Sequence, residues 1–454
     1  MTKRGNWNSR IGFILAASGS AVGLGNIWRF PYTAGKNGGA AFLIIYLAAI
    51  AALALPVLLA EAALGRATGK NPVGAFKAIV PRGLWRGIGY LGVTAGFMIL
   101  SYYAVIAGWT LGYFFKALRG EFSRLSTAGN KAAAMSRQNF ETFTSSPVLQ
   151  IILIAVFLGL TVYVTSRGVS GGIERWSKML MPVLLGLLLL LMIRALTLKG
   201  AGAGIEFYLK PDFSLITPSV IIAAMGQAFF SLSLGIGTMI TYGSYVKKTE
   251  NLPASTGWIA LCDTFIAVTA GFIIFPAVFS QGMDPAEGPG LVFNILPVIF
   301  AKIPLGQVFG AFFFLLLAIA ALTTTVSLLE VPVAYFIDER GWPRRRAAWI
   351  AGAICLVFGI PAALSQGSVG FLTRLPLVHT DFLSFWDLIW GNLALSIGAL
   401  LIAVFVGWIW KSGNALLEIS RGSRRFRPAF LWVIAIRYVA PVLILVILLS
   451  KILA

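Results

Sequence analysis

The fold is decided by two stretches of sequence, Ser18-Gly19-Ser20-Ala21-Val22-Gly23-Leu24-Gly25-Asn26 and Phe230-Ser231-Leu232-Ser233-Leu234-Gly235-Ile236-Gly237. Each lies in the middle of a long apolar segment and combines hydroxyl side chains with paired glycines. Inside a bilayer, irregular backbone persists only where protein or a water-filled cavity satisfies its polar groups. Glycines that merely permit close helix packing would explain either stretch alone. Their recurrence five predicted helices apart favours two repeats, each opening with a discontinuous helix.

The composition around these stretches is that of a membrane protein. Hydrophobic residues make up 58% of the chain, charged residues 11%, and the mean hydropathy is +0.86. A water-soluble domain cannot bury that much apolar surface. A hydrocarbon core about 30 Å thick needs about 20 apolar residues per helix, and the runs 39–60, 87–115, 213–246 and 303–329 contain no charged residue. Transmembrane strands would alternate apolar and polar residues, so we expect an all-α polytopic protein.

We predict about eleven transmembrane helices, with the approximate limits 10–35, 39–65, 85–118, 147–166, 172–196, 214–247, 256–281, 304–336, 345–363, 381–410 and 427–452. Residues 1–196 would form the first repeat, residues 197–410 the second, inverted repeat, and residues 411–454 a basic loop with the last helix. The sixth helix is too long for one straight span, so it must tilt or break.

The net charge of +20 is explained by topology. In a soluble protein it would suggest nucleic acid, but here most lysines and arginines fall in alternate loops. The positive-inside rule then places the N-terminus in the cytoplasm, and an odd number of helices leaves the C-terminus outside. We therefore expect a multi-pass protein of the inner (plasma) membrane, in contact with lipids and without a nucleic-acid partner. Specific lipid binding by the basic clusters is the alternative, and no obligate protein partner is indicated.

The sequence offers little for catalysis. His379 is the one histidine, and both cysteines, Cys262 and Cys355, fall within predicted spans. No H-E-x-x-H helix and no G-x-x-x-x-G-K-[ST] loop is present. The protein is therefore predicted not to be an enzyme, and any transport must be driven by a gradient.

The broken spans suit a zwitterion and a cation together. A half-helix starting near Asn26 offers free N–H groups to a carboxylate, while carbonyls around Gly19, Ala21 and Val22 can ligate a cation. Asp263 lies in an otherwise apolar span, where an ionised carboxylate costs at least about 2.5 kcal/mol, so it needs a partner. Sodium is one candidate partner, and a group on another helix is the alternative.

At this point the chain resembles the neurotransmitter:sodium symporters, in the eleven-helix branch of bacterial leucine and hydrophobic amino-acid transporters. The resemblance covers essentially the whole chain, and the order of its motifs makes it specific. These motifs are W-x-x-R at Trp7 to Arg10, AVGLGN-x-x-RFP from Ala21, NGGAAF from Asn37, E-x-x-x-GR from Glu61, SYY from Ser101, GQ-x-FFSLSLG from Gly226 and A-x-LTT from Ala320.

The resemblance implies two sodium sites made of oxygen ligands, which suit a hard cation. The first would use Ala21, Asn26, Ser231 and Asp263, and the second Gly19, Val22, Ala320, Thr323 and Thr324. The threonine hydroxyls could instead only cap backbone carbonyls. Much of the family has Asn at the position of Asp263 and uses bound chloride, whereas here Ala267 replaces the serine of chloride-dependent members. No chloride is therefore expected.

The resemblance also implies a substrate pocket for an apolar L-amino acid. The carboxylate would meet the amides of Leu24 and Gly25 and the Tyr103 hydroxyl, and the amine would face carbonyls near Phe230 and Ser233. The predicted substrate-binding residues are Ser20, Leu24, Gly25, Ile99, Tyr103, Ile106, Phe230, Ser231, Ser233, Ile236, Thr324 and Leu328.

Two gates are implied as well. Outside, Arg29 would pair with Asp387, although Asp381 lies nearby; inside, Arg4 would pair with Asp338, backed by Trp7 and Tyr245. Gly172 and Pro182 would let the start of helix five unwind and release sodium, or they mark an ordinary helix start with a kink.

We therefore predict sodium-coupled symport of an apolar L-amino acid into the cell by alternating access. A sensor that binds without turnover is one alternative, although the chain shows no added signalling domain. A channel is the other, but it would need a continuous polar pore, and the spans offer only isolated acids such as Glu61, Asp263 and Glu330.

Overall fold

The computed structural model describes residues 5–283, 291–376, 378–423 and 426–453, and within these ranges it contains helices and no strands. Nine helices in the described ranges are long and apolar enough to cross a membrane, and the bent first pair makes ten. The predicted sixth span is divided into two short helices. The all-α polytopic fold is confirmed.

The spans lie close to their predicted limits. They are α1 with α2 (Arg10–Ala21 and Phe30–Lys36), α3 with α4 (Ala40–Ala49 and Leu55–Thr68), α6 (Arg86–Leu118), α9 (Pro147–Ser166), α10 (Arg175–Leu196), α12 with α13 (Pro218–Ser231 and Thr238–Gly243), α14 (Leu252–Ser280), α16 (Gly306–Arg340), α17 (Arg344–Leu364), α19 with α20 (Phe382–Trp386 and Leu395–Val404), and α22 with α23 (Ala429–Ile434 and Ala440–Leu453).

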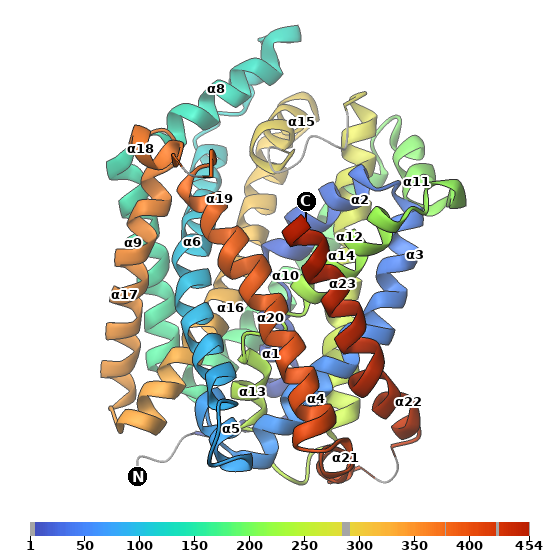
Figure 1. Cartoon of the computed structure of the whole chain (residues 1–454). Coiled ribbons are helices and arrows are strands. Elements are labelled where there is room, and N and C mark those ends of the chain that lie inside the picture. Colours follow the sequence, from blue (N-terminus) through green and yellow to red (C-terminus); the bar gives the residue numbers. More distant parts are fainter. Residues whose placement is uncertain (1–4, 284–290, 377, 424–425, 454) are drawn as a thin grey trace.

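Short helices cover the two ends of the bundle (Figure 1). One end carries α8 (Ala132–Thr144), α11 (Ala201–Leu209), α15 (Leu296–Lys302) and α18 (Gly370–Thr373), and the other carries α5 (Pro72–Ile79) and α21 (Ser412–Ser420). We call them the outer and inner faces, following the predicted topology. The described chain starts at the inner face and ends at the outer face (Figure 1), as an odd number of spans requires. A further short helix, α7, spans Ser123–Ser126.

The first span is broken where the sequence predicts it. The helix α1 ends at Ala21, a π-helical turn begins at Gly25, and the two halves are bent by 51°. A Cβ atom on Gly23 would lie 2.7 Å from both the Thr324 and Tyr103 hydroxyls. A Cβ atom on Gly25 would lie 2.8 Å from the Phe230 ring. The glycines therefore let α6, α12 and α16 approach the broken backbone.

The sixth span breaks rather than tilts. The backbone between α12 and α13 turns through positive φ at Ser233 (51°), Gly235 (89°) and Gly237 (80°), a region that glycine enters without steric cost. The Gly235 amide donates to Oε1 of Glu61 at 2.7 Å. A buried carboxylate on α4 thus replaces a hydrogen bond that the interrupted helix cannot make.

The start of the fifth span is held to the N-terminal segment. A π-helical turn, Val169–Glu174, leads into α10. The Glu174 carboxylate accepts from the Asn8 amide at 2.8 Å and from the Ser9 hydroxyl at 3.0 Å. Gly172 lies in the wound turn, and Pro182 lies inside α10. Unwinding between them stays a prediction, as do the limits of the two repeats.

Substituting Gly235 should destabilise the protein. In Gly235→Ala the new methyl group would lie 2.1 Å from the Leu395 carbonyl oxygen, at a φ that alanine rarely adopts. We expect the free energy of unfolding to fall by about 3 kcal/mol, measured as a lower unfolding temperature in detergent. The control is Gly226→Ala in α12, where nothing lies within 4 Å of the new Cβ atom. Equal unfolding temperatures for the two variants would contradict this account.

Candidate functional site

A buried polar cluster joins the two breaks to α14. Asn26 donates through Nδ2 to Oδ1 of Asp263 at 2.7 Å and to the Ser231 hydroxyl at 2.9 Å. The Ser231 hydroxyl donates to Oδ2 of Asp263 at 2.6 Å. Tyr46 adds a longer hydrogen bond to Ser231 at 3.3 Å. The structure thus brings together three of the four residues predicted for the first sodium site, and all of them are buried.

The surroundings of Asp263 contain no basic partner in the described part of the chain. The carboxylate faces neutral hydrogen-bond donors, and no lysine or arginine of the described ranges forms an ion pair with it. A buried carboxylate without a counter-charge is costly. Ala21, the fourth predicted ligand, is the buried last residue of α1, and such helix-end carbonyls lack intrahelical donors. These residues therefore fit a monovalent cation better than a structural ion pair.

The second predicted sodium site is a group of oxygens around Thr324. Its hydroxyl oxygen lies 3.5 Å from the Gly19 carbonyl, 3.4 Å from that of Ser20, 3.3 Å from that of Val22 and 3.2 Å from that of Ala320. One hydroxyl has one hydrogen and can satisfy one of these acceptors. The excess of oxygens fits a hard cation.

Thr323 behaves differently from its neighbour. Its hydroxyl caps the carbonyls of Ile319 and Ala320 within α16, at 3.3 and 3.0 Å. It still lies against the first span, because a Cβ atom on Gly19 would be 3.1 Å from Cβ of Thr323. Thr323 thus only caps carbonyls within its own helix, the alternative noted for the pair, whereas Thr324 contacts the Ala320 carbonyl of α16 and also the carbonyls at the end of α1.

A cavity of about 1440 Å³ leads from the outer face to the first break. Leu24, Gly25, Tyr103, Ile106 and Phe230 are among the residues that line it, together with residues of the outer loops. Several predicted substrate residues are therefore reached from the outer face. Ser20, Ile99, Ser231, Ser233, Ile236, Thr324 and Leu328 are not among the lining residues.

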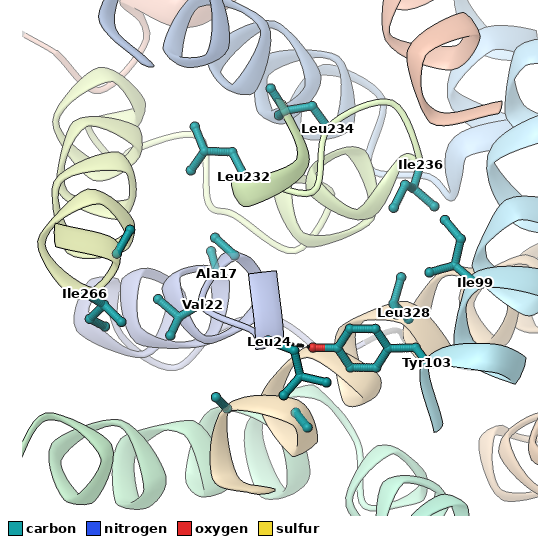
Figure 2. Packing of buried hydrophobic residues seen from close by; sticks show 14 of the residues in the cluster. Ala17, Val22, Leu24, Ile99, Tyr103, Leu232, Leu234, Ile236, Ile266 and Leu328 are labelled. Carbon is teal, nitrogen blue, oxygen red and sulfur yellow. Dashed lines mark hydrogen bonds between the residues drawn. The ribbon is translucent and has the colours of Figure 1, made fainter. Parts of the chain in front are cut away.

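The remaining substrate residues surround the same break. The Leu24 amide donates to the Tyr103 hydroxyl oxygen at 2.9 Å, and Ile99, Ile236 and Leu328 gather beside that tyrosine from three separate elements (Figure 2). The three side chains are buried. They form an apolar wall beside the start of the second half-helix.

Polar side chains continue the site towards the two breaks. The Ser20 hydroxyl donates to the Ser327 hydroxyl at 2.7 Å. Ser233 makes a longer contact, 3.4 Å, to the Ser20 carbonyl. Both breaks and α16 are therefore linked through hydroxyl groups.

The predicted outer gate is indirect in this structure. Arg29 lies over the Phe230 ring, 4.2 Å from its centroid, and reaches Oδ1 of Asn392 at 3.4 Å. Asn392 donates to Oδ2 of Asp387 at 3.0 Å, and the Tyr102 hydroxyl donates to Oδ1 at 2.8 Å. The expected direct pair of Arg29 with Asp387 is not formed here, because Asn392 lies between the two charges.

The alternative acid, Asp381, has another role. It caps the start of α19 by accepting from the Ser384 amide at 3.0 Å, and it accepts from Gln366 at 2.8 Å. The acid that faces Arg29 through Asn392 is therefore Asp387.

At the inner face, Arg4 lies outside the described residues, so its pairing with Asp338 stays a prediction. Asp338 accepts from the backbone amide and the side chain of Asn71, at 2.9 and 3.0 Å. The Trp7 indole donates to the Tyr242 carbonyl at 3.0 Å, and its ring meets Tyr245 edge-on with the centroids 6.1 Å apart.

Tyr245 is itself fixed by a buried charge pair. Its hydroxyl donates to Oε1 of Glu330 at 2.6 Å, and Arg344 forms an ion pair with Glu330. The predicted inner residues Trp7 and Tyr245 are thus packed together, and α16 and α17 supply the charges behind them.

Some site residues were not predicted. Gln227 donates to the Gly25 carbonyl at 3.1 Å, and its place in an apolar span could have indicated it. Glu61 could have been indicated in the same way, because it is an acid within an apolar span. Tyr46, Tyr102 and Asn392 carried no comparable signal, because an uncharged tyrosine or asparagine within a span does not stand out as an acid does.

Two broken spans, two oxygen clusters beside one break and a cavity reaching it from one face define a secondary transporter of the membrane. The Sodium:neurotransmitter symporter family matches residues 4–145 and 137–454. The chain belongs to this family. It is therefore a sodium-dependent transporter and a multi-pass membrane protein, and the family's members are symporters rather than enzymes.

Similar proteins match most or nearly all of the chain. The sodium-dependent transporter YhdH of Bacillus subtilis (strain 168) is 40% identical over 447 residues, which cover 98% of this chain and 97% of the relative. The human sodium- and chloride-dependent taurine transporter is 31% identical over 385 residues, 74% of this chain and 61% of the relative. The crystal structure of MhsT in complex with L-phenylalanine is 46% identical, with a TM-score of 0.88, covering 99% of this chain and 100% of that one.

The oxygen group around Thr324 can be tested without a substrate. Sodium that binds the folded state raises its unfolding temperature. In Thr324→Val the hydroxyl is lost at nearly constant volume, and we expect the sodium concentration for half-maximal stabilisation to rise at least about tenfold. Thr324→Ser keeps the hydroxyl and serves as the control. An unchanged sodium dependence in the valine variant, with choline as the reference cation, would contradict this assignment.

Proposed function

We propose that this protein carries an apolar L-amino acid into the cell together with two sodium ions, by alternating access and without chloride. The observation that carries this proposal is that Asp263, Asn26 and Ser231 lie beside the same break that forms the base of the outer cavity. Family membership supports sodium coupling.

The two proposed ions would hold the broken span in place. At the first site, the Asp263 carboxylate supplies the charge and joins α14 to Asn26 and to Ser231 at the end of α12. At the second site, Thr324 joins α16 to the carbonyls at the end of α1. Sodium binding would therefore fix the two half-helices relative to α14 and α16, which ties ion binding to the shape of the substrate pocket.

The proposed amino acid would lie between the two breaks. Its carboxylate would face the Gly25 amide and the Tyr103 hydroxyl, which already accepts from the Leu24 amide. Its ammonium group would face carbonyls at the end of α12. The apolar wall of Ile99, Ile236 and Leu328 suits an apolar side chain. The L-phenylalanine named in the MhsT complex supports the same class.

The proposed direction of transport rests on the predicted topology. The basic loops favour a cytoplasmic inner face, so the cavity would open to the outside and the pair of Trp7 and Tyr245 would lie on the closed inner side. Sodium would leave inwards when the segment between Gly172 and Pro182 loosens, because Met181 in this segment approaches Gly19 of the second site.

The direct test is uptake by proteoliposomes. With an inward sodium gradient, we expect labelled L-phenylalanine or another apolar L-amino acid to accumulate against its gradient, and no accumulation in potassium. Asp263→Leu should lose uptake, while Gly226→Ala serves as a folded control. Failure of every L-amino acid to accumulate would reject the proposal. Binding without uptake would indicate a sensor, and equilibration without accumulation a channel.

Independence from chloride follows from charge and can be tested separately. Asp263 would supply a negative charge at the first site, and Ala267 one turn later is buried and offers no hydroxyl to an anion. We expect undiminished sodium-driven uptake when gluconate replaces chloride on both sides of the membrane. The comparison is the initial rate at several sodium concentrations. A chloride requirement at saturating sodium would show that Asp263 does not supply the missing charge.

A further inference from the structure

A lysine from the last span enters the outer gate. Lys451 lies near the end of α23, and its ammonium group donates to Oδ1 of Asn392 at 3.0 Å. Arg29 reaches the same oxygen at the longer distance of 3.4 Å. Two cations from the first and last spans thus share one amide oxygen.

The charges around Asn392 fix the orientation of its amide. A carboxylate lies on one side, since Nδ2 donates to Oδ2 of Asp387 at 3.0 Å and also to the Asp387 carbonyl at 3.1 Å. The ammonium group of Lys451 lies on the other side. Rotating the Asn392 amide by half a turn would place its oxygen against the Asp387 carboxylate and its N–H groups against the Lys451 ammonium group. Both contacts would be repulsive, so the two charged groups fix the amide in the orientation observed.

The direction of the Lys451 side chain is unusual for its position. A lysine near the end of a transmembrane helix commonly extends towards the lipid headgroups. Here the ammonium group turns inwards to α19 and α20, where Asn392 lies in the π-helical turn Asp387–Ala394. The helix α23 lies along α20 in the bundle (Figure 1). The last span thus supplies a charge to the gate as well as an apolar surface to the lipid.

We propose that Lys451 is a positioning residue of the outer gate, which rests on the proposed alternating-access function. In the open state, Arg29 is held weakly by Asn392 and by the Phe230 ring. On closure, Arg29 moves from the amide oxygen to the Asp387 carboxylate. Lys451 stays on Asn392 and keeps its N–H groups on Asp387, so that the carboxylate faces the incoming guanidinium group.

A cysteine reporter below the gate measures closure without measuring transport. Ile106 lines the cavity, so Ile106→Cys should react with a membrane-impermeant thiol reagent when the gate is open. Because Ile106 is also a predicted substrate residue, L-phenylalanine binding by this variant is measured first, and every labelling rate with ligand is taken at saturating ligand. The reference protein also carries Cys262→Ala and Cys355→Ala, because those are its two native cysteines. Its labelling should be fast in potassium and slow in sodium with L-phenylalanine.

In this background, Lys451→Met removes the charge and keeps the length of the side chain. We expect labelling in sodium with L-phenylalanine to become about fivefold faster than in the reference protein, with no change in potassium. Lys451→Arg should restore slow labelling. Ser450→Ala, on the neighbouring residue, removes only a hydroxyl that caps the Ile447 carbonyl and should label like the reference.

A double variant tests whether Lys451 acts through Asn392. If it does, Lys451→Met combined with Asn392→Leu should label no faster than Asn392→Leu alone, because the two changes break one connection. A role of Lys451 in helix packing alone would lower the unfolding temperature and leave the labelling rates unchanged.

The outcomes separate the two proposals. If sodium with L-phenylalanine, or with any other L-amino acid that binds, does not slow labelling in the reference protein, the proposed closure is wrong and this inference falls with it. If the reference is protected and Lys451→Met is protected equally, the inference alone is overturned. Additive effects in the double variant would also overturn it.

Discussion

The structure depends on how broken backbone is satisfied inside a medium that offers no water. Each break frees amide and carbonyl groups that an intact helix would pair. Side chains from other spans take over: the Tyr103 hydroxyl accepts from Leu24, Glu61 accepts from Gly235, and Gln227 donates to the Gly25 carbonyl. The positions of α4, α6 and α12 are therefore set by the polar groups of the breaks as much as by apolar packing.

This arrangement also explains why the proposed ion sites lie beside the breaks. The carbonyls at the end of α1 have no donor within that helix. The Thr324 hydroxyl lies near four carbonyl oxygens but can donate to one of them. The Asp263 carboxylate meets only neutral donors among the described residues. Oxygen is thus in excess at both places, which supports the proposal that a cation binds at each. The breaks that interrupt the helix hydrogen bonds would then also supply ligands to the proposed ions.

Much of the fold was predictable because hydropathy and glycine placement are local properties. Spans such as α6 and α9 were located closely from their apolar runs, and both breaks were found from the glycines near Gly23 and Gly235. Asp263 was found because an acid stands out in an apolar span. Asn392, Lys451 and Tyr46 could not be found in this way, since their contacts join residues far apart in sequence and depend on how the spans pack. The bridge between Arg29 and Asp387 was missed for that reason.

The contacts of Glu174 have a mechanical consequence for the inner face. This carboxylate, at the first turn before α10, holds the Asn8 amide, the Ser9 hydroxyl and the ammonium group of Lys178 at once. The space beside it is filled, because a Cβ atom on Gly12 would overlap it at 2.1 Å. The N-terminal segment and the start of the fifth span are therefore held together and should move together. Any force that lifts Trp7 from the inner face pulls on the helix whose Met181 borders Gly19.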